Sequence, residues 1–148
     1  MAMTVKKRTG GLVLAIWLFT VGAGRAEPQA DFVLVVNAEN EVTTISRKDV
    51  ELIFLNKQRS WPDGKNIGVV INENPKIYES FSHTVLRRSS SQFLVFRKKM
   101  LFRGQGMPSP TLKTDKDVIV FVTEHVDSIS YVSPDAVTPA VKVVSILQ

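Results

Sequence analysis

The sequence predicts a single α/β domain, an open mixed sheet of about four strands flanked by helices. Apolar runs typical of buried strands alternate with segments whose apolar residues recur at i, i+3 and i+4, the spacing of one helix face. A serine, threonine or asparagine precedes each helical segment, as N-cap residues do. The predicted order is β, α, β, α, α, α, β, β, which favours a sheet with helices packed on its faces.

Residues 1–26 have the pattern of a secretory signal peptide. Three bases at positions 6–8 are followed by an apolar run from Leu12 to Val21. These ten residues are about half of the roughly 20 that a membrane-spanning helix needs. We therefore expect a protein of the periplasm or the cell exterior, with no stable membrane insertion of the mature chain. An uncleaved membrane anchor is the alternative interpretation of this segment.

The cleavage site is expected after Ala26, because Gly24 and Ala26 take the −3 and −1 places of a small-x-small motif; Ala23 is the alternative. The mature chain is then one domain over residues 27–148. Four of the 19 bases and none of the 14 acids lie in the removed part, so the mature charge is nearly balanced. This excludes the strongly basic domain that nucleic-acid binding favours. With no cysteine in the chain, burial alone must stabilise the remaining ~120 residues.

The first half of the mature chain predicts strand, helix and strand. Phe32–Val36 is a continuous apolar run, typical of a strand covered on both faces. Ser46 opens a capping box for a helix that ends near Asn56, and Ile67–Ile71 forms the next apolar run. Two further strands are expected at the end of the chain, over residues 129–132 and 141–146.

Three more helices are predicted between these strands. Asn74 is expected to cap a helix that starts at Pro75, Ser89 opens one that ends at Gly104, and Thr114 opens the last. The apolar spacing places one phenylalanine of each of the four helices on its buried face: Phe54, Phe81, Phe96 and Phe121.

The sequence contains no constellation typical of catalysis or metal binding. His83 and His125 have no ligand-type partner at i+3 or i+4, whereas zinc sites take three or four ligands. His125 is instead expected as a half-buried residue at a helix end. There is no cysteine and no Gly-x-Ser-x-Gly motif, and Ser89–Ser91 is explained by helix capping. We expect a protein that is not an enzyme and needs no cofactor or metal.

One cluster of basic residues stands out around residues 87–103. Arg97, Lys98 and Lys99 fall on or beside the helix face opposite Phe93 and Met100, which predicts a solvated face. A patch for an anionic surface or partner is the alternative. The cluster consists of Arg87, Arg88, Arg97, Lys98, Lys99 and Arg103.

Polar loops follow three of the predicted strands, over residues 37–46, 72–76 and 131–133. In open α/β sheets, ligands bind beyond the carboxyl ends of strands, where helix N-termini present free N–H groups. Together the loops predict a site for a small anion; the alternative is that their residues only cap helices and end strands. The candidate ligand-binding residues are Asn37, Thr44, Ser46, Asn72, Asn74, Lys76, Tyr131 and Ser133.

The same loops resemble a known family. The segments concerned are Val35–Val42, Ile45–Lys57 followed by Trp61, Phe102–Gly106 and Ile129–Ser133. They are similar to the phosphate-binding subunit of phosphate ABC transporters. The similarity runs over nearly all of the mature chain but covers only one lobe of that two-lobed family, as in its short single-lobe relatives. The resemblance implies one lobe of a type II periplasmic binding protein. It also implies a partner that is a small anion such as phosphate, or a periplasmic or membrane protein.

The sequence departs from this family where phosphate would bind. Family members open the helix after the second strand with an arginine and Ser-Gly-Thr, and Asn72–Ile77 stands there instead. Pro75 lacks an N–H donor and Glu73 repels an anion, while Lys76 supplies one positive charge. Two functions remain open: a solute-binding protein with a degenerate, weak anion site, and an interaction or structural protein that has lost its ligand.

Overall fold

The computed structural model describes residues 31–106 and 109–148, so the predicted signal peptide lies outside the described residues. The strands are β1 (Val33–Asn37), β2 (Thr44–Ser46), β3 (Gly68–Val69), β4 (Ile71–Asn72), β5 (Thr111–Leu112), β6 (Ser128–Val132) and β7 (Val141–Leu147). The helices are α1 (Arg47–Phe54), α2 (Pro75–Thr84), α3 (Ser90–Phe102) and α4 (Asp115–Glu124), with the short 3-10 helix η1 (Pro134–Ala136). In the two described ranges, no helix combines the length and apolar character needed to cross a membrane.

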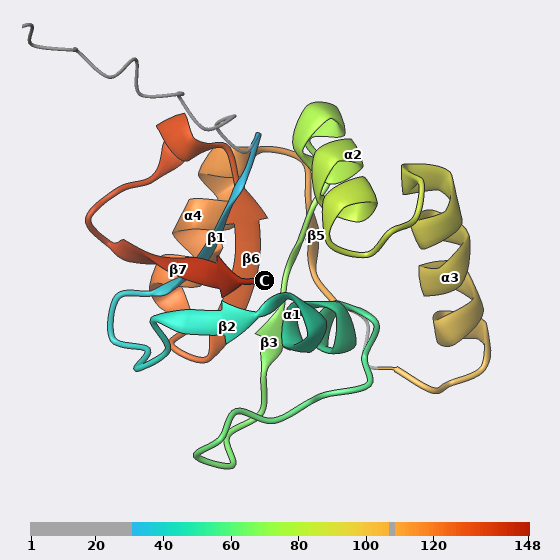
Figure 1. Cartoon of the computed structure of the whole chain (residues 1–148), viewed down its shortest axis with the longest axis horizontal. Helices are drawn as coiled ribbons and strands as arrows, with labels where there is room; N and C mark the ends of the chain where they lie inside the picture. Colours follow the sequence, from blue (N-terminus) through green and yellow to red (C-terminus); the bar gives the residue numbers. More distant parts are fainter. Residues whose placement is uncertain (1–30, 107–108) are drawn as a thin grey trace, which may run out of the picture.

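The main sheet is mixed and has five strands in the order β2-β7-β1-β6-β3. The central strand β1 is antiparallel to both β6 and β7, whereas the edge strands β2 and β3 are parallel to their neighbours. Helices α1 and α2 lie on one side of this sheet and α4 on the other, with α3 standing beyond α2 (Figure 1). The predicted α/β architecture is confirmed, with one strand more than expected.

The predicted strand over residues 67–71 is wrong in one respect, because it is divided. β3 pairs with β6 in the main sheet, and β4 pairs with β5 in a separate two-stranded sheet. The change of partner occurs at Val70, whose N–H donates to Ile129 O while the next N–H, of Ile71, donates to Pro110 O. An apolar run marks the strand but carries no information on which neighbour each residue pairs with. β2 and β5 were not predicted, since neither has an apolar run.

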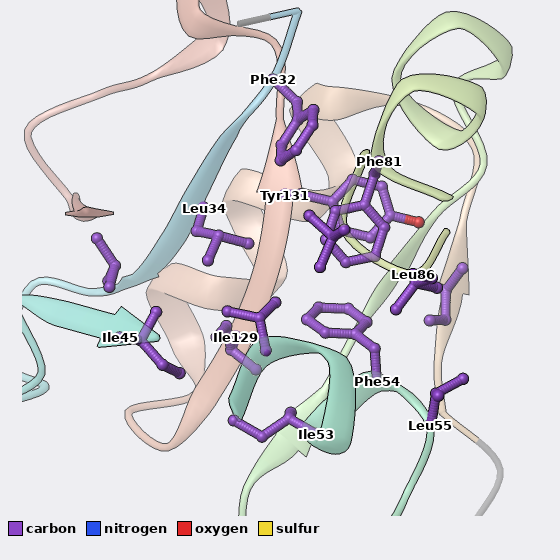
Figure 2. Packing of buried hydrophobic residues seen from close by; sticks show 14 of the residues in the cluster. Phe32, Leu34, Ile45, Ile53, Phe54, Leu55, Phe81, Leu86, Ile129 and Tyr131 are labelled. Carbon is purple, nitrogen blue, oxygen red and sulfur yellow. The ribbon is translucent and has the colours of Figure 1, made fainter. Parts of the chain in front are cut away.

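Both faces of β1 are buried, as its continuous apolar run predicts. Leu34 and Val36 point into a core formed with α1 and α2, part of which Figure 2 shows. Val35 points the other way, into a second cluster with Val118 and Val122 of α4. The alternation of side chains along the strand therefore feeds two cores, one on each face of the sheet.

Helix starts follow the predicted caps in three of four cases. Ser46, Ser89 and Thr114 each accept a hydrogen bond from the backbone N–H three residues on. Asn74 occupies the N-cap position of α2, but its side chain makes no capping bond. Its amide turns to another partner, Asp115, which is described below.

Two of the four phenylalanines predicted to be buried are only partly so. Phe54 and Phe81 are 5% and 0% exposed, whereas Phe96 and Phe121 lie at the edges of their helices' buried faces. Phe96 has the Arg88 guanidinium 5.5 Å above its ring. α3 buries Phe93 fully, but Met100 only in part. α3 therefore packs through less of its surface than its apolar spacing predicts.

His125 corrects another expectation. It is exposed at the C-cap of α4 rather than half-buried, and its ring stacks on that of Phe121 with centroids 3.9 Å apart. Among residues 31–106 and 109–148, no three His, Asp or Glu side chains are grouped as metal ligands would be.

Candidate functional site: an anion cradle around Asp115

Three of the predicted ligand residues converge on one carboxylate. Asn72 Nδ2 donates to Asp115 Oδ1 at 2.6 Å, and Asn74 Nδ2 lies 3.4 Å from Asp115 Oδ2. The backbone N–H of Ser133 donates to the same Oδ2 at 3.4 Å. We call Asn72, Asn74, Ser133 and the Asp115 carboxylate between them the Asp115 cradle. Its donors come from the end of β4, the start of α2 and the loop after β6, so two of the three predicted polar loops do meet.

Tyr131 holds Asn72 of the cradle in place through two hydrogen bonds. Its hydroxyl donates to Asn72 O at 3.0 Å, and Asn72 Nδ2 donates to Tyr131 O at 2.9 Å. Tyr131 is fully buried, and burial raises the pKa of its phenol well above the ordinary value. The phenol therefore stays protonated at neutral pH and acts as a donor that fixes Asn72, rather than as a group that contacts solvent.

The first polar loop does not join this site. Asn37 Nδ2 donates to the carbonyls of Val122 and Thr123, at the C-terminal end of α4, whereas Asp115 is the first residue of that helix. A helix of ten residues is about 15 Å long. β1 runs antiparallel to β6, so the carboxyl ends of these two strands point in opposite directions along the sheet. The expectation that all three loops lie together is therefore wrong for the loop after β1, because it requires β1 and β6 to be parallel.

Thr44 and Ser46 lie on the edge strand β2, with β7 and β1 between them and β6. At about 4.8 Å per strand spacing, this places them roughly 14 Å from β6, the strand that precedes Ser133 of the cradle. Ser46 is occupied as the N-cap of α1, where its Oγ accepts from Asp49 N at 3.0 Å and donates to Asp49 Oδ2 at 2.7 Å. Thr44 is exposed.

Lys76, the one predicted cation of the site, turns to a different carboxylate. Its Nζ lies 3.5 Å from Asp31 Oδ1, and the side chain is 76% exposed. Asp31 also accepts from Ser80 Oγ at 3.3 Å, one turn along α2. The pair is a surface ion pair, so Lys76 brings no positive charge into the cradle as the structure stands.

Sequence reasoning missed Asp115 as a site residue. The Thr114–Asp117 pair signals a helix start, and an acid at the first helical position is ordinarily explained by the helix dipole. Nothing local indicates that this carboxylate reaches Asn72, which lies 43 positions away along the chain. Only the pairing of β4 with β5, which itself was not predicted, brings the two together.

The prediction that Arg97 lies on a solvated face is wrong. Its side chain is only 18% exposed, with Nη1 3.6 Å from Glu73 Oε1. Nη2 donates to Thr111 Oγ1 at 2.6 Å, and the guanidinium lies 5.8 Å from the centroid of the Phe93 ring. Arg97 thus ties α3 to the β4–β5 pair. Arg97 therefore has a structural role. Lys98 and Lys99 are exposed as predicted, and Arg103 is exposed as well.

No protein-family model and no curated protein matches this chain. Solved structures do match. A phosphate transport receptor of ABC type from Vibrio cholerae aligns with a TM-score of 0.60 at 16% identity, over 78% of this chain and 46% of that one. The chain has the fold of one lobe of a periplasmic binding protein.

Two further binding proteins share this fold. A phosphate ABC transporter substrate-binding protein from Clostridium perfringens, solved with bound phosphate, aligns with a TM-score of 0.54 at 18% identity, over 78% of this chain and 44% of that one. PstS from Borrelia burgdorferi aligns with a TM-score of 0.55 at 12% identity, over 78% of this chain and 47% of that one. This chain therefore spans about half the length of the binding proteins that it resembles. At these identities the likeness concerns the fold.

Proposed function

We propose that this chain is a non-enzymatic protein of solute-binding fold whose anion site is degenerate, because its own Asp115 carboxylate occupies the donors. The observation that carries the proposal is the 2.6 Å contact between Asn72 Nδ2 and Asp115 Oδ1, with Asn74 and Ser133 turned to the other carboxylate oxygen. The likeness of this fold to binding proteins, one of them solved with bound phosphate, supports an ancestral anion site.

An external anion would have to enter beside a fixed negative charge. Two like charges 4 Å apart repel by about 4 kcal/mol at an effective dielectric constant of 20. The donors would also have to leave Asp115, and the described residues place no unpaired base in the cradle, since Lys76 pairs with Asp31 and Arg97 with Glu73. We expect phosphate affinity no better than about millimolar, a binding free energy of ~4 kcal/mol.

Calorimetry with phosphate and with sulfate tests this proposal. The wild type should give no heat at micromolar anion, and Asp115→Ala, which frees the three donors, should gain weak binding. Asp117→Asn is the matched control: it removes one charge from the same first turn of α4, and the side chain of Asp117 hydrogen-bonds to Thr114 among the described residues. Micromolar binding by the wild type would contradict the proposal, as would equal gains in the two variants.

A second candidate function, an interaction protein without a small ligand, is favoured by the charge distribution. Residues 80–114 contain seven Lys and Arg and no Asp or Glu. Such a segment suits an acidic protein surface in the periplasm or at the membrane, the location that the predicted signal peptide implies. The two candidates are compatible, because the cradle and this segment use different residues.

A further inference from the structure

α3 carries exposed apolar residues among its bases. Val95 and Phe102 are 50% and 91% exposed, and they share one helix stripe with Lys99 at i, i+4 and i+7. A shallow hollow of about 560 Å³ at the N-terminal end of this stripe is lined by Arg87, Arg88, Val95, Phe96 and Lys99, with Ser91 and Gln92. We call these residues together with Phe102 the α3 surface.

The bases of the α3 surface have no acidic partner within the described part of the chain. The ion pairs found there involve Lys48, Lys65, Lys76 and Arg97, and none involves Arg87, Arg88 or Lys99. Covering an exposed phenylalanine with another surface is favourable, because it removes apolar area from water, and the unpaired bases beside it can then pair with acids of that surface. The α3 surface therefore fits a partner that offers both carboxylates and apolar contact.

The same chain presents a surface of that kind elsewhere. Two loops, over residues 38–43 and 60–66, enclose a hollow of about 280 Å³ with apolar contributions from Val42, Trp61, Pro62 and Val126. Its rim carries four acids and one base: Glu39, Glu41, Asp63, Asp127 and Lys65. We call this the acidic hollow.

Lys65 only partly neutralises the acidic hollow. Its Nζ lies 3.3 Å from Asp63 Oδ2. The hydrogen bond to Asp63, with the charges of Asp63, Asp127 and Glu41, raises the pKa of Lys65, which shows that several carboxylates act on one ammonium. A rim of net negative charge, with apolar side chains such as Val42 and Trp61 in the same hollow, is the electrostatic complement of the α3 surface.

We propose that the α3 surface of one molecule docks on the acidic hollow of a second copy of this chain. The loop at residues 60–66 and α3 lie at separate parts of the molecule (Figure 1), so the contact joins two different surfaces. If both molecules dock reciprocally a closed dimer results, and one-sided docking gives an open chain of copies. The inference does not rest on the anion site, because no residue of the Asp115 cradle belongs to either surface.

The test exchanges the charges of the two surfaces. Arg87→Glu with Lys99→Glu makes the α3 surface acidic, and Glu39→Lys with Glu41→Lys makes the hollow basic; all four side chains are exposed. In sedimentation velocity at low ionic strength, the wild type should associate and should dissociate at about 1 M salt, where the Debye length is ~3 Å. Each double variant alone should be monomeric, and a mixture of the two should associate again.

The matched control is Lys57→Glu with Lys116→Glu, which reverses two exposed bases outside both surfaces and should leave association unchanged. Phe102→Ala should weaken association about tenfold, as loss of one buried aromatic ring does. A wild type that stays monomeric at about 1 mM protein would overturn the proposal. So would a mixture that fails to associate, or double variants that associate as the wild type does. A monomeric wild type that is retained on anionic vesicles would assign the α3 surface to a membrane instead.

Discussion

The ring of Phe81 stacks flat on the ring of Tyr131, with centroids 3.9 Å apart and planes 3° from parallel. The two residues join α2 to β6 across the centre of the main core, where both are fully buried (Figure 2). Because the Tyr131 hydroxyl also donates to Asn72 O, the stack positions the end of β4. The geometry of the Asp115 cradle thus depends on the buried Phe81–Tyr131 stack.

Phe81→Ala is expected to destabilise the protein by about 3–5 kcal/mol, the cost of removing a large buried ring. Phe81 also contacts Phe32 and Phe54 edge to face, so little of the space can close after truncation. Urea unfolding monitored by circular dichroism measures this loss. Phe102→Ala, at a residue 91% exposed, is the control and should stay within about 0.5 kcal/mol. Equal losses of unfolding free energy in the two variants would mean that the buried Phe81 ring contributes no more to stability than an exposed one.

Tyr131 should make stability fall at alkaline pH. Burial raises the pKa of its phenol in the folded state above the ordinary value near 10. The folded state therefore keeps the proton while the unfolded state releases it, so stability is fully present below about pH 10 and is lost as pH rises beyond it. Urea midpoints at about pH 8 and about pH 11 should differ more in the wild type than in Tyr131→Phe.

Tyr78→Phe is the comparison for this pH dependence. Burial raises the pKa of Tyr78 too, but Arg97 acts against the rise, and Tyr78 is only partly buried. The variant should keep most of the alkaline loss of stability. At neutral pH, Tyr131→Phe should cost about 1–2 kcal/mol, since Asn72 O loses a buried donor. An alkaline loss that persists unchanged in Tyr131→Phe would exclude this phenol as its source.

Local signals predicted the helices well because caps and apolar spacing act within one or two turns. Ser46 and Ser89 begin α1 and α3 as expected, and Ser89 forms a full capping box with Gln92. What could not be predicted depends on partners far away in the sequence. Val70 marks a change of strand partner, and Asp115 reaches Asn72 only through the pairing of β4 with β5.

The candidate site shows the same limit. The structure brings Asn72, Asn74, Tyr131 and Ser133 together, whereas ligand binding by them stays a prediction. Asn37 was placed with them although β1 is antiparallel to β6. Strand direction is a property of the whole sheet, and an apolar run does not encode it.

The N-terminus of the protein from a cell envelope or culture supernatant should be Glu27. The short apolar run, its basic flank and the Gly-Arg-Ala sequence before Glu27 are the features that a signal peptidase recognises. N-terminal sequencing or intact-mass measurement decides between this site and one after Ala23. Recovery of intact Met1 in the membrane fraction would establish an uncleaved anchor instead.

Ser46 and Thr44 were both candidates for ligand binding, and the structure gives them different roles that a pair of variants separates. Ser46→Ala removes the oxygen that accepts from Asp49 N and should cost about 1 kcal/mol, within the 0.5–2 kcal/mol typical of an N-cap. Ser46→Asn, which keeps a capping oxygen, should recover most of this loss. Thr44→Ala, at an exposed residue two positions earlier on the same strand, should change stability by less than about 0.5 kcal/mol. Because both residues lie on β2, three strand spacings or roughly 14 Å across the sheet from β6, neither variant should alter the heat measured when phosphate is titrated into Asp115→Ala. A loss of that heat in a Ser46→Ala, Asp115→Ala double variant that remains folded would place Ser46 in the anion site after all.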